Sequence, residues 1–232
     1  MKSKPIIALD FSNQKDLDHF LNQFKNEKLF LKVGLELFVK FGSNIITQLK
    51  NQGHQIFIDL KLHDIPNTVE NAFTNLIELN PDIITVHAAG GVDMLKNLRQ
   101  IIDEHQASTK IFAVTILTSI NNEVLSEQWK VNKTVEQQVL DFAQIAKSAQ
   151  LDGVVCSVGE VEQIKQKFGS DFLCLTPGIR NHLKHSDQKR VATIQEAKQA
   201  KSDFIVVGRE ITKSSKPYET YLEIKKVWEE NE

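Results

Sequence analysis

Short runs of apolar residues recur along the chain, and stretches with helical spacing separate them. The runs are three or four residues long and rich in Ile, Val, Leu and Phe, which is typical of strands buried on both faces of a parallel sheet. We predict eight strands, at residues 6–9, 30–33, 56–58, 83–86, 111–114, 154–156, 172–175 and 204–207.

Between the strands, apolar residues return every three or four positions, as on one face of an amphipathic helix. Leu17, Phe20 and Phe24 show this spacing after the first strand. Eight strands that alternate with helices in 232 residues favour a compact (β/α)8 TIM barrel. The alternative is a doubly wound open sheet, although no G-x-G-x-x-G motif follows the first strand. Because linkers and low-complexity tracts are absent, we expect residues 1–232 to form a single domain.

The most informative segment is residues 59–68, D-L-K-L-H-D-I-P-N-T, between the third strand and a helix expected over residues 69–77. Side chains alternate along a strand, so Asp59 and Lys61 are expected to face the same way, while Asp64 lies past the strand end. Carboxylates favour the charged form of a nearby lysine, which then fills the place of a metal cation. The pattern therefore indicates a proton donor rather than a metal site, although D-x-K-x-x-D alone also fits a surface ion-pair cluster.

Residues at the carboxyl ends of the strands are candidates for one site, because barrel enzymes carry their chemistry there. Lys32 lies within an apolar run, where a lysine is rare unless paired, and Asp10 or the acids after the third strand offer a partner. Asp10 also fits a helix cap, and Thr118 a hydrogen bond to the backbone. His87 is interpreted as a structural histidine, and the role of His63 stays open. The further candidates at strand ends are Thr118, Pro177, Arg180, Gly208 and Arg209.

Glycine and arginine after the last strand indicate an anion site. Gly208 lets a ligand approach the backbone, and the guanidinium of Arg209 can bind two phosphate oxygens at once. Barrels commonly bind phosphate after their seventh and eighth strands. The polar loop 180–190 lies between these two strands and is long enough to close over a ligand as a lid.

Composition narrows the class of protein. The chain is 41% hydrophobic and 25% charged, which is ordinary for a globular protein. A formal net charge of −2 gives no reason to expect a nucleic acid or an anionic membrane as partner. Cys156 and Cys174 lie in apolar runs without metal-ligand spacing, which fits buried thiols in a reducing compartment. With no signal-peptide pattern and no apolar stretch of membrane-spanning length, we expect a cytoplasmic protein.

As a whole, residues 59–68 resemble the active-site segment of the orotidine 5'-phosphate decarboxylase family. The resemblance extends over the whole chain and implies a (β/α)8 barrel. It also implies a carbon–carbon lyase that converts orotidine 5'-phosphate (OMP) to UMP and CO2 in pyrimidine biosynthesis. The other matching motifs are A-L-D at 8–10, K-V-G at 32–34, V-H-A-A-G-G at 86–91, T-I-L-T-S at 115–119, T-P-G-I-R at 176–180, D-Q at 187–188 and G-R at 208–209.

The resemblance implies a role for each motif residue. Lys61 would donate a proton to C6, with Asp59 beside it and beside the substrate carboxylate. Asp64 and Thr68 would reach into the active site of a second chain, making the enzyme a homodimer. Neither a metal nor an organic cofactor is implied. The substrate contacts would be Asp10 and Lys32 at the ribose hydroxyls, Thr118 at the pyrimidine, Pro177 nearby, and Arg180, Gln188, Gly208 and Arg209 at the phosphate end.

Two other functions stay open on the sequence alone. One is a Mg²⁺-dependent decarboxylase or aldolase of the same barrel superfamily that acts on a sugar phosphate and shares D-x-K-x-x-D. The other is a non-catalytic barrel that binds phosphorylated metabolites, although such a protein has no need of a pre-positioned proton donor. Turnover of OMP with and without a chelator separates these functions.

Overall fold

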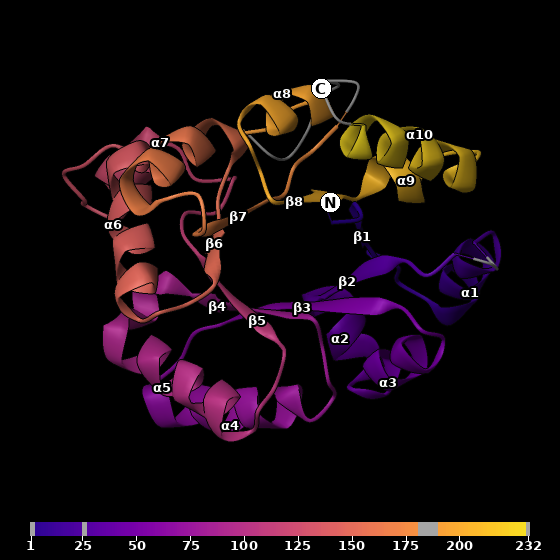
Figure 1. The fold of residues 1–232 in the computed structure, drawn as a ribbon, viewed down its shortest axis with the longest axis horizontal. Helices are drawn as coiled ribbons and strands as arrows, with labels where there is room; N and C mark the ends of the chain where they lie inside the picture. The colour runs from indigo at the N-terminus through magenta and orange to yellow at the C-terminus, as the bar shows by residue number, and fades with distance from the viewer. Residues whose placement is uncertain (1–2, 25–26, 181–189, 231–232) are drawn as a thin grey trace.

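The computed structural model describes residues 3–24, 27–180 and 190–230. Eight parallel strands follow one another around a closed barrel, in which β1 pairs with both β2 and β8 (Figure 1). The predicted (β/α)8 barrel is therefore confirmed, and the alternative of an open sheet is wrong. The strands are β1 (Ile6–Ala8), β2 (Phe30–Gly34), β3 (Gln55–Leu62), β4 (Ile83–His87), β5 (Lys110–Val114), β6 (Gly153–Val155), β7 (Leu173–Thr176) and β8 (Phe204–Val207).

Helices surround the ring of strands (Figure 1). Within the described part of the chain, no helix is both long and apolar enough to cross a membrane. A 3-10 turn, η1 (Ala88–Gly90), follows β4, and a π-helical turn, η2 (Val124–Gln128), follows β5. The α-helices are α1 (Gln14–Asn22), α2 (Leu35–Phe41), α3 (Asn44–Asn51), α4 (Pro66–Ile77), α5 (Gly91–Glu104), α6 (Val135–Ser148), α7 (Val158–Phe168), α8 (Ile194–Gln199), α9 (Arg209–Thr212) and α10 (Pro217–Glu229).

Every predicted strand overlaps an observed one, and the differences lie at the ends. The largest is at β3, which continues to Leu62 instead of ending at residue 58. The helix expected over residues 69–77 begins earlier, at Pro66. Proline suits the first helical position because its missing N–H would have no partner there. Ile65 before it is extended, with φ −60° and ψ 148°, as the residue before a proline prefers.

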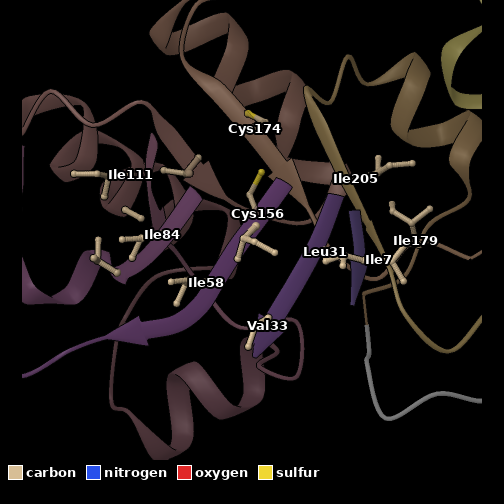
Figure 2. Packing of buried hydrophobic residues seen from close by; sticks show 14 of the residues in the cluster. Ile7, Leu31, Val33, Ile58, Ile84, Ile111, Cys156, Cys174, Ile179 and Ile205 are labelled. Carbon is tan, nitrogen blue, oxygen red and sulfur yellow. The ribbon is translucent and has the colours of Figure 1, made fainter. Parts of the chain in front are cut away.

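Two layers of apolar side chains build the core. One lies between the strands and the surrounding helices, and Figure 2 shows part of it with the buried free thiols Cys156 and Cys174. The other fills the inside of the barrel, where the ring of Phe204 on β8 meets the rings of Phe30 on β2 and Phe112 on β5 edge to face. The inner layer consists of Ile6, Ala8, Phe30, Phe57, Ile83, Phe112, Leu175 and Val206.

The inner layer continues into charged residues at the carboxyl end of the barrel. Asp10 follows Ala8 by two positions, and Asp59 follows Phe57 by two. Because side chains alternate along an extended chain, these carboxylates point to the same inner side as the apolar residues below them. Lys32 occupies the corresponding position on β2, and all three charged residues line one cavity. The barrel thus places charges above an apolar floor.

Candidate active site

A cavity of about 400 Å³ opens at the carboxyl ends of the strands, where barrel enzymes carry their sites. It brings together most of the predicted residues. One wall, which we call the acid–lysine side, consists of Asp10, Lys32, Asp59 and Lys61. Another, which we call the arginine side, consists of Arg180, Gly208 and Arg209. Thr118 and Pro177 also line the cavity.

Asp59 is the centre of the acid–lysine side. Its Oδ1 accepts a hydrogen bond from Lys61 Nζ at 2.9 Å, and its Oδ2 lies 3.5 Å from Lys32 Nζ. Lys32 Nζ also lies 3.7 Å from Asp10 Oδ1. The prediction that Lys32 is paired is therefore confirmed, and it pairs both with Asp10 and with Asp59 of β3. The side chains of Lys32 and Asp59 are only 14% and 12% exposed, so water screens this pair weakly.

Asp59 keeps its negative charge. Burial raises the pKa of its carboxyl group, but the ammonium groups of Lys32 and Lys61 lower it by more. Hydrogen bonds from Lys61 and Thr85 lower it further, so the pKa lies below the ordinary value of an aspartate. A metal ion at Asp59 would face two ammonium groups, and the described residues contain no group of three His, Cys, Asp or Glu placed to hold one. The two lysines therefore supply the positive charge at Asp59 that a metal ion would otherwise provide.

The backbone at Lys61 departs from a regular strand. Its φ of 52° lies in the left-handed region, which costs a residue with a side chain about 1–2 kcal/mol. Ile58 and Leu62 of β3 pair with β4 residues that are only two positions apart, so a bulge places three β3 residues opposite Thr85. Asp59 and Lys61 meet as predicted, but they do so across this bulge and not through simple alternation.

Thr85 is a site residue that the sequence did not reveal. Its side chain is fully buried on β4. Its hydroxyl donates a hydrogen bond to Asp59 Oδ1 at 2.9 Å and accepts one from the backbone N–H of Lys61 at 3.1 Å. A threonine in the apolar run 83–86 was the available signal, but threonine is common in strands and does not by itself indicate a site.

The arginine side is built from segments that follow β7 and β8. Gly208 precedes α9, and Arg209 is the first residue of that helix. A Cβ atom at Gly208 would lie 3.6 Å from Ala8 Cβ and 3.8 Å from Asp10 Oδ2, so a side chain there would occupy the edge of the cavity. Glycine thus leaves room for a ligand next to the backbone, as the sequence suggested.

Only the two ends of the predicted lid can be followed. The backbone N–H of Arg180 donates to the carbonyl of Ala192 at 2.9 Å, and Ile179 forms a parallel β-bridge with Ala192. These contacts hold the chain together on either side of residues 181–189. Gln188 and the rest of that segment lie outside the described residues, so the role predicted for Gln188 stays a prediction.

Arg190, which the sequence placed only at the end of the lid, reaches the loop after β5. Its Nη2 donates to the carbonyl oxygens of Ile116 and Leu117 at 2.9 and 3.0 Å, and its Nη1 contacts Glu160. These carbonyls immediately precede Thr118. Arg190 therefore connects the segment after β7 to the loop that carries one wall of the cavity.

Comparison with known proteins agrees with this geometry. Residues 3–224 match the family described as Orotidine 5'-phosphate decarboxylase / HUMPS. The chain belongs to this family. It is 47% identical over 229 residues to the orotidine 5'-phosphate decarboxylase of Staphylococcus saprophyticus, covering 98% of this chain and 99% of the relative. It is 48% identical over 224 residues to that of Malacoplasma penetrans, covering 96% and 97%.

Solved structures of similar sequence have the same fold. The orotidine 5'-phosphate decarboxylase from Lactobacillus acidophilus is 40% identical, with a TM-score of 0.85 over 98% of this chain and 99% of that one. An uncharacterized conserved protein from Geobacillus kaustophilus is 37% identical, with a TM-score of 0.84 over 96% and 99%. At these identities and coverages, the barrel of this chain is that of the decarboxylase family.

Two residues expected from the family resemblance lie apart from the cavity of their own chain. Asp64 and Thr68 are exposed, and neither lines the cavity. Asp64 Oδ1 accepts a hydrogen bond from the backbone N–H of Ile65 at 2.7 Å, and Thr68 lies in the first turn of α4. Their expected action in the site of a second chain stays a prediction.

His63 and His87 form a stacked pair beside the bulge, with ring centroids 5.2 Å apart and an interplanar angle of 22°. Burial, and then the charges of His63 and Lys61, lower the pKa of His87 to about 4. Its Nδ1 accepts a hydrogen bond from the backbone N–H of Ala89 at 3.2 Å, which requires an unprotonated nitrogen. These contacts support the structural role predicted for His87, since it caps η1 as a neutral ring.

Proposed function

We propose that this chain is an orotidine 5'-phosphate decarboxylase, a carboxy-lyase of a single catalytic domain, residues 1–232, that converts OMP to UMP and CO2. One observation carries the proposal: a lysine ammonium is held 2.9 Å from a buried carboxylate in a cavity that Arg209 also lines, in a chain of the decarboxylase family. The two relatives described above are named orotidine 5'-phosphate decarboxylase, and they are 47–48% identical to this chain over nearly its full length.

Lys61 is proposed as the proton donor. Loss of CO2 breaks the bond between C6 and the carboxyl carbon and leaves the electron pair on C6. The ammonium of Lys61 then gives a proton to C6, which forms the C–H bond of UMP, and the resulting amine regains a proton from water. Asp59 fixes the Lys61 ammonium through their hydrogen bond and places negative charge where the substrate carboxylate departs.

The remaining cavity residues are proposed to bind the substrate. Asp10 and Lys32 form an ion pair whose free hydrogen-bonding positions suit the two ribose hydroxyls. Thr118 contacts the pyrimidine, next to the backbone that Arg190 holds. The phosphate end is bound by Arg180, Gln188, the Gly208 backbone and Arg209, with Pro177 in the adjoining wall.

No single contact explains the barrier that this reaction presents. A carbanion at C6 has no conventional electron sink, and enzymes at the upper end of the usual range lower barriers by about 23 kcal/mol. A charge-assisted hydrogen bond contributes about 1.5–3 kcal/mol, and proton transfer contributes about 10²–10⁴ in rate. We propose that binding at the phosphate end supplies much of the remainder by organising the site, which raises kcat and not only affinity.

The proposed enzyme is a homodimer whose site takes Asp64 and Thr68 from the second chain. Both residues are exposed and outside their own cavity. Large apolar side chains are also exposed in this part of the chain. Ile65, next to Asp64, is 67% exposed. Leu35 and Val39 on α2, which follows the neighbouring strand β2, are 56% and 80% exposed. Burying them against a second copy would remove this apolar surface from water.

We propose catalysis without a metal or an organic cofactor, in the cytoplasm, where a reducing environment suits the two free cysteines. The argument against a metal is the charge at Asp59, where two ammonium groups already provide the positive charge. This separates the proposal from a Mg²⁺-dependent enzyme acting on a sugar phosphate.

The direct test is the loss of OMP absorbance on incubation with the purified protein, with and without EDTA. We expect UMP and CO2 at equal rates in both. Absence of turnover would overturn the proposed function. Turnover that disappears with EDTA and returns with Mg²⁺ would overturn the metal-free mechanism. A parallel reaction with a sugar phosphate tests the rival substrate, for which we expect no conversion.

A further inference from the structure

The carboxylate of Asp59 has two oxygens in different surroundings. Oδ1 accepts two hydrogen bonds, from Lys61 Nζ and from the Thr85 hydroxyl, each at 2.9 Å. Oδ2 lies 3.5 Å from Lys32 Nζ. Rotation of the carboxylate would exchange or break these contacts. Of these three partners, Thr85 is the one without a charge, and its buried hydroxyl on β4 helps to fix the orientation of the carboxylate.

Thr85 also contacts the backbone of β3 at the point where the pairing of β3 with β4 is irregular. At the bulge, β3 offers residues 59–61 opposite Thr85 alone, so regular ladder pairing is interrupted there. The backbone N–H of Lys61 donates to the side-chain oxygen Thr85 Oγ1 of β4 at 3.1 Å. A side-chain oxygen thus satisfies the N–H at the residue with left-handed backbone.

The direction of these hydrogen bonds is fixed. A hydroxyl has one proton and two lone pairs, and the Lys61 N–H can only donate while the charged Asp59 carboxylate can only accept. The Thr85 proton must therefore point to Asp59, and its lone pair to Lys61. One hydroxyl ties the carboxylate and the backbone of the proposed proton donor to the same rigid strand.

We infer that Thr85 is a positioning residue for decarboxylation, which orients Asp59 and fixes the bulge that aims the Lys61 ammonium into the cavity. Thr85 does not line the cavity, so it acts through its two partners and not on the substrate. The inference rests on the proposed decarboxylase function for its kinetic consequence, while its geometric part holds for the folded chain alone.

The test compares three variants of the full chain. Thr85→Val keeps the β-branched shape but removes the hydroxyl, and Thr85→Ser keeps the hydroxyl. Thr109→Val is the matched control. Thr109 is also a buried threonine, 3% exposed, whose hydroxyl donates to the Pro81 carbonyl at 2.7 Å, but it precedes β5 at the opposite end of the barrel.

We expect Thr85→Val to lower kcat for OMP by about 10- to 100-fold, the effect of losing one hydrogen bond to a charged group. KM and the affinity for UMP should change little, because the arginine side is intact. Thr85→Ser should restore most of kcat, and Thr109→Val should keep it. Equal kcat in Thr85→Val and the wild type, or equal losses in Thr85→Val and Thr109→Val, would overturn the inference.

Hydrogen exchange of the Lys61 amide gives a readout that does not need turnover. We expect faster exchange in Thr85→Val and near wild-type exchange in Thr85→Ser and Thr109→Val. Unchanged exchange of the Lys61 amide in Thr85→Val would overturn the positioning role, whether or not the wild type is active. Absence of wild-type activity alone would overturn only the proposed function. If Thr85→Val does not fold, Thr85→Cys replaces it, because a thiol is a weaker hydrogen-bond donor and acceptor than a hydroxyl. We expect kcat to fall in Thr85→Cys as well, but by less than in Thr85→Val.

Discussion

The acid–lysine side and the arginine side of the cavity are built in different ways. On the acid–lysine side, Lys32, Asp59 and Lys61 extend from β2 and β3 and Asp10 follows β1, and each charged group lies within 3.7 Å of the next. On the arginine side, Arg180 follows β7 in a loop and Arg209 begins the short helix α9 after β8, and the chain between them includes residues outside the described part. Strands hold side chains more rigidly than loops do.

This difference corresponds to the two tasks of the proposed enzyme. The reacting carbon needs charges that are already in place, because reorganising them during the reaction would raise the barrier. The phosphate group does not react, so its contacts can form while the ligand binds and still contribute to the rate. The following three experiments test whether the two sides divide the work in this way.

Lys61→Ala should have the largest effect, because it removes the proposed proton donor while leaving the arginine side intact. We expect kcat for OMP to fall by at least about 10²–10⁴-fold, with UMP affinity largely retained. Lys61→Arg is the matched variant, since it keeps positive charge beside Asp59 but releases a proton with difficulty, and it should also be inactive. Near wild-type kcat in Lys61→Ala would remove Lys61 from its role.

Arg209→Ala should have the next largest effect on kcat/KM, and only when the substrate carries a phosphate. Loss of a bidentate guanidinium–phosphate contact should cost about 3 kcal/mol in kcat/KM for OMP, and little for the phosphate-free nucleoside orotidine. The kcat/KM of Arg209→Lys for OMP should lie between those of the wild type and Arg209→Ala, because an ammonium keeps the positive charge but cannot form two parallel hydrogen bonds to phosphate. Arg99→Ala, which removes an ion pair with Asp103 on α5, is the control for loss of an arginine. Equal losses with OMP and orotidine would show that Arg209 does not bind phosphate.

Mixing two inactive variants tests whether Asp64 belongs to a third part of the site, supplied by a second chain. In an exchanged mixture of Lys61→Ala and Asp64→Ala chains, about a quarter of the sites should combine an intact cavity with an intact Asp64. Activity should return to about that fraction of the wild-type value.

The control for this mixture is Lys61→Ala with Asp59→Ala. Both changes fall in the cavity of a single chain, so no mixed dimer has a complete site and no recovery is expected. Recovery in the first mixture but not the second supports the shared site. If subunits exchange and neither mixture recovers, Asp64 acts within its own chain.

The barrel and the acid–lysine side could be predicted from the sequence because both follow from local rules. Apolar runs of strand length give the order of strands, and charges at inward positions give the cluster. Lys32 was recognisable because an isolated lysine is costly in an apolar strand, and its two carboxylate partners followed from the barrel geometry.

Other features depend on contacts between segments that no local pattern reports. The bulge at Lys61 interrupts the two-residue alternation on which the prediction relied, so the partner role of Thr85 could not be read from β4 alone. The sequence marks Arg190 only as a polar residue at the end of a loop, yet it binds carbonyls 73 and 74 positions earlier in the chain. α4 begins at Pro66 and not at residue 69 because proline, which often ends a helix, fits the first helical position.

The left-handed backbone of Lys61 has a consequence for how the sequence can change. A fold optimised for thermal stability alone would place glycine at this position, since glycine accepts φ 52° without the cost that lysine bears. Lys61 therefore occupies a position whose backbone conformation favours glycine. Screens that select only for heat resistance should drift away from lysine here, and those that also demand turnover should never do so.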